Sequence, residues 1–152
     1  MNNLSYDLVS KVFSDVLSDV VSKTTGISIT TTDEDAGLDE LIGLMSLNGY
    51  NHGMVIISAG HATVKKLCNS MTGISIDEVT DNDIYDTLCE LVNMTAGNAK
   101  LRFNSSEDIY SLSPPFIISG EDMSIITKNR VDFITRTLSG DGISLTLRVV
   151  FY

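Results

Sequence analysis

The pattern of apolar and polar positions predicts a long amphipathic helix at residues 4–24. Apolar residues recur there every three or four positions, as on one face of a helix, while serine, lysine and aspartate fill the other side. Gly26 follows at a position where helices commonly end in a left-handed residue. A shorter helix is predicted at residues 61–71, because its pattern stops before Gly73.

A second long helix is predicted at residues 82–102. Thr80 and Asp81 are both candidates for its N-cap, since a short oxygen-bearing side chain can accept a hydrogen bond from an amide of the first turn. The residues expected on the buried face share the helical spacing: Ile84, Leu88, Leu91, Val92, Thr95 and Ala99.

Alternating or β-branched apolar runs predict about six strands in the rest of the chain. The Asn48-Gly49 pair between two such runs is typical of a hairpin turn, and Gly140-Asp141-Gly142 is expected to form another turn. The segments concerned are 27–32, two strands within 38–58, 116–118, 123–127, 131–138 and 143–151.

Two long helices and several strands joined by short turns predict an α+β fold with a largely antiparallel sheet. We expect the helices to cover one face of that sheet. The length of 152 residues fits one domain, so a single domain over residues 1–152 is expected. The last strand, residues 143–152, alternates regularly and has no proline, which indicates an edge open to pairing with a second chain.

Composition and charge narrow the class of protein. The 20 acidic and 10 basic residues give a formal net charge of −10, which argues against a nucleic-acid partner and against an anionic membrane surface. No apolar run approaches the ~20 residues that span a bilayer. Residues 1–13 lack the basic and apolar regions of a signal peptide, so we expect a soluble protein of the cytoplasm.

The cysteine and histidine positions give no sign of a metal site. Cys68 and Cys89 lie in two predicted helices, and free buried thiols in a reducing compartment are expected. A disulfide would require those helices to pack face to face. His52 and His61 match no zinc-ligand spacing, and a capping role is expected for His61, which follows Gly60 at a helix start.

Four residues of the second long helix are candidates for a function. Asp86, Glu90, Asn93 and Gly97 are spaced i, i+4, i+7 and i+11, which places them in one stripe opposite the apolar face. Gly97 costs about 1 kcal/mol relative to alanine inside a helix, so close packing or partner docking should offset it. From the spacing alone, an ordinary solvated face is the simpler interpretation.

The residues around this stripe resemble a known family. The string Glu-Leu-Val-Asn-Met-Thr-Ala-Gly-Asn-Ala-Lys, residues 90–100, is similar to the signature of the CheX-like members of the CheC/CheX/FliY family. Ser-Pro-Pro at 113–115, followed by an apolar strand and Gly120, is similar as well. The order of the predicted elements also resembles that family, and the resemblance covers nearly the whole chain. It implies a CheC/CheX-like fold.

The resemblance implies a phosphatase that acts on the phospho-aspartate of CheY, or of a similar receiver, in chemotaxis signalling. The Glu and Asn of the family correspond to Glu90 and Asn93. Relatives of the CheC type carry two Glu-x-x-Asn helices, whereas the first helix here offers only Asp7-x-x-Ser10 and Asp15-x-x-Ser18. The resemblance therefore implies one site per chain and, as is typical of CheX-like proteins, a homodimer.

Simple physical chemistry supports these roles. Asn93 would orient the attacking water, because a neutral carboxamide is not repelled by a phosphoryl group. Glu90 would pair with a lysine of the receiver and fix the docking register. Mg²⁺ is expected to come with the receiver, so the chain needs no cofactor of its own.

Several alternatives remain open from the sequence. Asp86 and Gly97 are candidates for partner contact, but Asp86 is also explained by solvation and Gly97 by packing on a neighbouring strand. A different class of function is a non-catalytic module that binds a receiver or belongs to a flagellar switch. The exposure of Asn93 distinguishes the two classes, because a buried Asn93 would favour the binding module.

Overall fold

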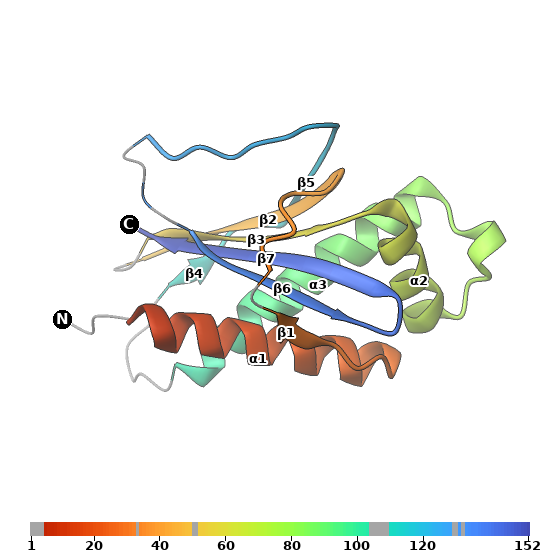
Figure 1. Cartoon of the computed structure of the whole chain (residues 1–152), viewed down its shortest axis with the longest axis horizontal. Helices are drawn as coiled ribbons and strands as arrows, with labels where there is room; N and C mark the ends of the chain where they lie inside the picture. Colours follow the sequence, from red (N-terminus) through yellow and green to blue (C-terminus); the bar gives the residue numbers. More distant parts are fainter. Residues whose placement is uncertain (1–4, 33, 50–51, 104–109, 129–130, 132) are drawn as a thin grey trace.

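The computed structural model describes residues 5–32, 34–49, 52–103, 110–128, 131 and 133–152. Figure 1 shows the helices gathered on one side of a sheet, while residues 120–128, after β5, cross the other side. In chain order the elements are α1 (Tyr6–Thr25), β1 (Thr30–Thr32), β2 (Leu41–Asn48), β3 (Gly53–Ala59), α2 (His61–Thr72), the 3₁₀ helix η1 (Ile76–Glu78), α3 (Asp81–Arg102), β4 (Ser111–Leu112), β5 (Phe116–Ser119), β6 (Ile134–Gly140) and β7 (Ile143–Phe151).

The described residues form one seven-stranded sheet in which the paired strands are antiparallel. Its order is β1-β6-β7-β3-β2-β4, and β5 also pairs with β2. The α+β class and the antiparallel sheet are therefore confirmed. The predicted turn between β6 and β7 is confirmed too, since Asp141 and Gly142 have φ of 50° and 79°, as in the tight turns that suit hairpin twist.

The prediction that residues 143–152 form an exposed edge is wrong. Strand β7 pairs with β3 on one side and with β6 on the other, so it lies inside the sheet. Alternation and the absence of proline do not distinguish an edge strand from a central one. The burial of Thr146 and Val150, on the face expected to be polar, is the mark of a central strand. An exposed edge at residues 143–152 therefore no longer supports the homodimer, which stays a prediction.

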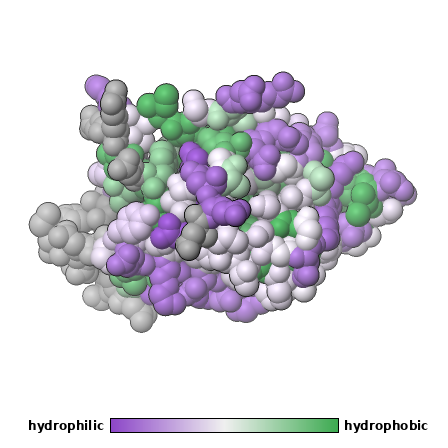
Figure 2. All heavy atoms as spheres, viewed as in Figure 1, coloured by the Kyte–Doolittle hydropathy of each residue, from purple (hydrophilic) through white to green (hydrophobic). Residues whose placement is uncertain are grey.

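The prediction of a strand at residues 123–127 is also wrong. These residues are extended but join no ladder, and their segment crosses the face of the sheet opposite α1 (Figure 1). Apolar side chains are visible on the surface of this side in Figure 2, and Phe116, Ile118 and Ile126 are exposed there. Met123 and Ile125 are only partly buried and Ile126 is exposed, so the apolar pattern of this segment predicts neither hydrogen bonding to a strand nor full burial.

The strand boundaries differ from the expected ones at two other places. Strand β1 begins at Thr30 rather than at residue 27, although Ile27 and Ile29 are buried as the alternation predicts. Strand β6 begins at Ile134 rather than at residue 131, and residue 132 of the expected strand lies outside the described residues. The hairpin of β2 and β3 is confirmed, but residues 50–51 of its turn also lie outside the described residues.

Helix α3 is held on the sheet by its apolar face. All six residues predicted on that face are buried, which confirms the helical pattern. Gly43 of β2 lets the helix approach closely, because a Cβ there would lie 3.0 Å from Leu88 Cγ. On another side of the helix, Tyr110 is fully buried and its hydroxyl donates to Ala96 O at 3.2 Å. These contacts fix which face of α3 remains exposed.

The helix ends follow from local capping chemistry. Thr80 caps α3, as predicted, and forms a reciprocal pair of hydrogen bonds with Asp83. The bonds donated by the Thr80 backbone and hydroxyl hold the pKa of Asp83 below its usual range. Ser5 caps α1 by accepting from the Leu8 amide at 3.2 Å. Among the described helices, none is both long and apolar enough to cross a membrane.

The predicted free thiols are confirmed, with one difference. Cys68 is fully buried, whereas Cys89 is only partly buried. Burial and the nearby Asp86 carboxylate raise the pKa of the Cys89 thiol. The thiol form is therefore favoured, and Cys89 is a poor nucleophile at neutral pH despite its place beside Glu90.

Candidate functional site

The exposed face of α3 carries the four residues that the sequence singled out. Asp86, Glu90 and Asn93 are exposed, and Gly97 is partly exposed. The buried residues of the helix lie on the opposite side, against the sheet and the other helices. The structure thus brings the four residues together in one stripe that a partner can reach.

Glu90 and Asn93 are the centre of this stripe. They lie one turn apart, about 4.5 Å along the helix axis. Within the described part of the chain, neither side chain takes part in a hydrogen bond or an ion pair. A carboxylate and a carboxamide held side by side without internal partners keep their full capacity to bind another molecule.

Gly97 is not explained by packing within the chain. The nearest atom to a Cβ at this position would be Leu112 Cδ1 of β4, at 4.0 Å, which is an ordinary contact. An alanine would therefore fit, although glycine costs about 1 kcal/mol more in a helix interior. The alternative of close packing on a neighbouring strand is thus too weak to require glycine.

The Ser-Pro-Pro motif shapes the strand edge below Gly97. Ser113 bonds to Ser46 of β2 twice, through its backbone amide at 3.0 Å and through its hydroxyl, which accepts from the Ser46 amide at 2.9 Å. Pro114 and Pro115 then separate β4 from β5, because proline has no amide hydrogen for a ladder. The motif positions Leu112 under α3 and is structural.

The charges of α3 are divided along its length. Its first turn contains Asp81 and Asp83, and its last turn contains Lys100 and Arg102. This distribution complements the helix dipole. It also makes the half of the helix that carries Asp86 and Glu90 acidic, while the last turn, beyond Gly97, is basic.

Helix α1 offers no second site of the same kind. Ser10 is buried, so the pair of Asp7 and Ser10 does not face solvent together. The Ser18 hydroxyl donates to Ile29 O at 2.9 Å, and the Asp15 carboxylate forms an ion pair with Lys11. Neither pair contains a carboxamide, so the described part of the two long helices presents one such Glu-Asn pair.

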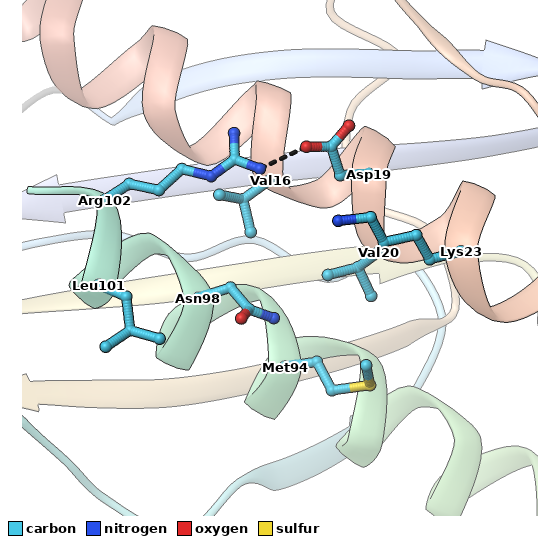
Figure 3. Close-up of a pocket in the computed structure, with 8 residues that line it drawn as sticks. All are labelled: Val16, Asp19, Val20, Lys23, Met94, Asn98, Leu101 and Arg102. Atoms are coloured by element: carbon cyan, nitrogen blue, oxygen red, sulfur yellow. Dashed lines mark hydrogen bonds and ion pairs between the residues drawn. The ribbon is translucent and has the colours of Figure 1, made fainter.

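A groove between α1 and α3 was not predicted from the sequence. Its volume is about 280 Å³. Figure 3 shows side chains of both helices around it, with the Asp19–Arg102 ion pair joining the helices at one end. No sequence signal locates it, because it exists only when the two helices lie side by side. The lining residues are Val16, Asp19, Val20, Lys23, Met94, Asn98, Leu101 and Arg102.

The histidines have no role in this site. The His61 amide donates to Glu40 Oε1 at 2.9 Å and His61 Nδ1 lies 2.8 Å from the same oxygen, so Glu40 caps α2. These bonds hold the pKa of Glu40 below its usual range. His52 is exposed. Among the described residues, no group of three or more His, Cys, Asp or Glu side chains is placed to hold a metal ion.

Comparisons with known proteins agree with the fold described above. The family model described as "Chemotaxis phosphatase CheX" matches residues 41–139. A solved chemotaxis protein CheX from Vibrio vulnificus is similar with a TM-score of 0.83 and 18% identity, over 97% of this chain and 99% of that one. No protein of curated function matches.

Two other solved structures share the fold. A chain of the CheX-CheY-BeF3-Mg²⁺ complex from Borrelia burgdorferi has a TM-score of 0.76 and 19% identity, over 98% of this chain and 99% of that one. A chain of the FliM-SpeE complex from H. pylori has a TM-score of 0.65 and 11% identity, over 95% of this chain and 84% of that one.

Proposed function

The chain belongs to the CheX family of chemotaxis phosphatases, and on this premise we propose that it hydrolyses the phospho-aspartate of a CheY-like response regulator. The family match includes Glu90 and Asn93, and it confirms the resemblance found in the sequence. The observation that carries the proposal is the exposure of these two side chains, one turn apart on α3 and without partners in the described chain. Residues 1–152 act as one domain in this proposal.

Asn93 orients the attacking water in the proposed reaction. Its carboxamide oxygen accepts a hydrogen bond from a water that lies in line with the bond between phosphorus and the aspartyl oxygen. Attack by the water releases the aspartate carboxylate and inorganic phosphate. Phosphoryl transfer depends mainly on such positioning and on electrostatics, so one well-placed amide is sufficient. A rate gain of about 10²-fold corresponds to roughly 3 kcal/mol.

Glu90 fixes the docking register. Its carboxylate pairs with a lysine at the active site of the receiver, as the resemblance implies, and thereby places Asn93 over the phosphoryl group. A carboxylate in the role of Asn93 would be repelled by the phosphoryl group, because both carry negative charge. Asp86 and Gly97 complete the contact: Asp86 extends the acidic end of the stripe, and Gly97 lets the receiver backbone approach.

The metal belongs to the substrate in this proposal. The Mg²⁺ of the phosphorylated receiver neutralises the phosphoryl charge, and the chain supplies only positioning groups. A solved relative in a complex with CheY, BeF3 and Mg²⁺ supports this division of roles. We place the reaction in the cytoplasm and expect a homodimer with one site in each chain. A solution mass equal to one chain at high micromolar concentration would argue against the dimer.

The second candidate is a binding module without hydrolysis. The likeness of the fold to a chain of the FliM-SpeE complex supports it, since that fold also serves in protein assemblies. The exposed Asn93 favours the phosphatase instead, because pure binding does not require a carboxamide beside the carboxylate.

The experiment follows the loss of phosphate from a phosphorylated receiver of the same cell. We expect the protein to accelerate decay and Asn93→Ala to abolish the acceleration while leaving receiver binding intact. Asn82→Ala is the matched control, since Asn82 is an exposed carboxamide on the same helix, about 16 Å from Asn93. If no receiver decays faster, or if Asn93→Ala retains full activity, the proposed function is wrong.

A further inference from the structure

We infer that the groove between α1 and α3 is a second contact site for the docked receiver. It takes an apolar side chain of the receiver that is flanked by an aspartate or a glutamate. This inference rests on the proposed function and adds to it, because the four residues of the stripe contact the receiver along a single line on α3. The groove lies beside that line and fixes the rotation of the receiver about it.

The groove has room for an inserted side chain. Its volume is about 280 Å³, close to the lower end of the ~300–1,000 Å³ of typical small-molecule pockets. The walls near its floor are apolar, from Val16 and Val20 of α1 and Met94 of α3, while Leu101 at the rim is largely exposed. Val16 and Val20 are already buried, so one apolar side chain inserted between the helices would remove the remaining exposed surface of Met94 and Leu101 from water.

The groove lies within the footprint of a docked receiver. A protein interface of standard size covers about 800 Å² on each partner, which is a patch roughly 30 Å across. Met94 follows Asn93 directly in the chain. Leu101 lies eight residues beyond Asn93, which is about 12 Å along the helix axis. Leu101 also points in nearly the same direction as Glu90, because eleven residues complete three turns. A receiver seated on Asn93 therefore reaches the groove.

The charge of the groove favours a receiver segment in which an aspartate or a glutamate lies next to the inserted apolar side chain. The chain as a whole carries −10, yet the groove is lined by Lys23 and Arg102 with Asp19 as its one acidic residue. Asp19 is paired with Arg102, so the positive charge of Lys23 is left uncompensated within the groove. A carboxylate beside the inserted side chain would pair with Lys23.

The groove is also formed before the partner arrives. The Asp19–Arg102 ion pair ties α1 to α3 at one end, as the dashed line in Figure 3 shows. Val16 and Val20, which line the groove, also belong to the buried core. A preformed site saves the ordering cost that binding would otherwise carry.

The test measures binding of a receiver activated with beryllofluoride and Mg²⁺, together with kcat and KM for the phosphorylated receiver. Lys23→Glu should raise Kd and KM about tenfold and leave kcat within about twofold, because it acts on docking and not on the water. Leu101→Asn should also raise KM, about fivefold, through lost apolar burial. Both side chains are exposed enough for the variants to fold, which circular dichroism will verify.

Matched controls lie on the segment between β5 and β6, across the sheet from the groove. Lys128→Glu makes the same change of charge, and Ile126→Asn replaces a side chain that is 84% exposed. Both should leave Kd, KM and kcat unchanged. If Lys23→Glu and Leu101→Asn behave like these controls in an active protein, the groove is not a docking site and the proposed function still stands. A fall in kcat at unchanged Kd for either groove variant would also contradict the docking role of the groove. If the wild-type protein binds no activated receiver, the docking role and the proposed function are both wrong.

Discussion

Gly43 of β2 lies directly under Leu88 of α3, so close that a Cβ on the glycine would come within 3.0 Å of Leu88 Cγ and 3.4 Å of Leu88 O. Leu88 is fully buried. The proposed functional residues are on the opposite side of the same helix, so the depth of this contact sets how far Glu90 and Asn93 project from the molecule.

Gly43→Ala should therefore destabilise the protein by about 1–3 kcal/mol, since overpacking a filled core has that cost. Urea unfolding measures the change. A double-mutant cycle with Leu88→Ala should show coupling of at least ~0.5 kcal/mol, because the smaller side chain makes room for the new methyl group. Additive effects of the two substitutions would show that the contact is not tight.

Gly97→Ala should have the reverse effect on stability and a cost in function. An alanine Cβ meets no atom closer than 4.0 Å and favours the helix, so the free energy of unfolding should rise by about 0.5–1 kcal/mol. The KM for the phosphorylated receiver should rise, because the bare backbone is lost. Denaturation and steady-state kinetics on the same sample check both parts. A more stable variant with unchanged KM would remove Gly97 from the interface.

Glu90→Gln should separate docking from chemistry. The substitution keeps the shape of the side chain and removes its charge, so KM should rise about tenfold with kcat at saturation nearly unchanged. Glu78→Gln, in the exposed η1 segment, removes the same charge elsewhere and should leave both constants unaltered. A lower kcat with an unchanged KM for Glu90→Gln would contradict the docking role.

The cap of α3 gives a pH-dependent prediction. Hydrogen bonds from Thr80 lower the pKa of Asp83 in the folded state below the ordinary value of 3.8. The carboxylate therefore contributes stability above that value and loses it as the pH falls through the lower folded pKa. Asp83→Asn should destabilise the protein at pH 7, and the difference from wild type should shrink towards pH 3. Urea unfolding at the two pH values checks this, and an equal difference at both would contradict it.

Elements with a strong local period could be predicted from the sequence. The inner face of α3, from Ile84 to Ala99, follows from helical spacing because each of these side chains must reach the same side of the helix. The cap at Thr80 and the turn at Asp141 follow from local chemistry in the same way. The stripe of Glu90 and Asn93 could be placed on the solvent face, but only the resemblance to a family suggested a chemical role.

Features that depend on distant parts of the chain could not be predicted. The position of β7 between β3 and β6 depends on which strands pair, and alternation within residues 143–151 contains no such information. The segment at residues 123–127 has the apolar pattern of a strand but only lies across the sheet. The groove requires Val16 and Met94 to meet across two helices that are far apart in the sequence.

The divided edge at β4 and β5 has a consequence for the solubility of the protein. A foreign strand that approached this side of the sheet would meet the four residues of β5, then Pro114 and Pro115, and would find no continuous row of amide donors. Such an interruption limits edge-to-edge aggregation of a β-rich chain. Replacing both prolines would lengthen the edge that can pair with another strand. The Ser-Pro-Pro motif therefore limits strand pairing between copies of the protein at this edge at high concentration.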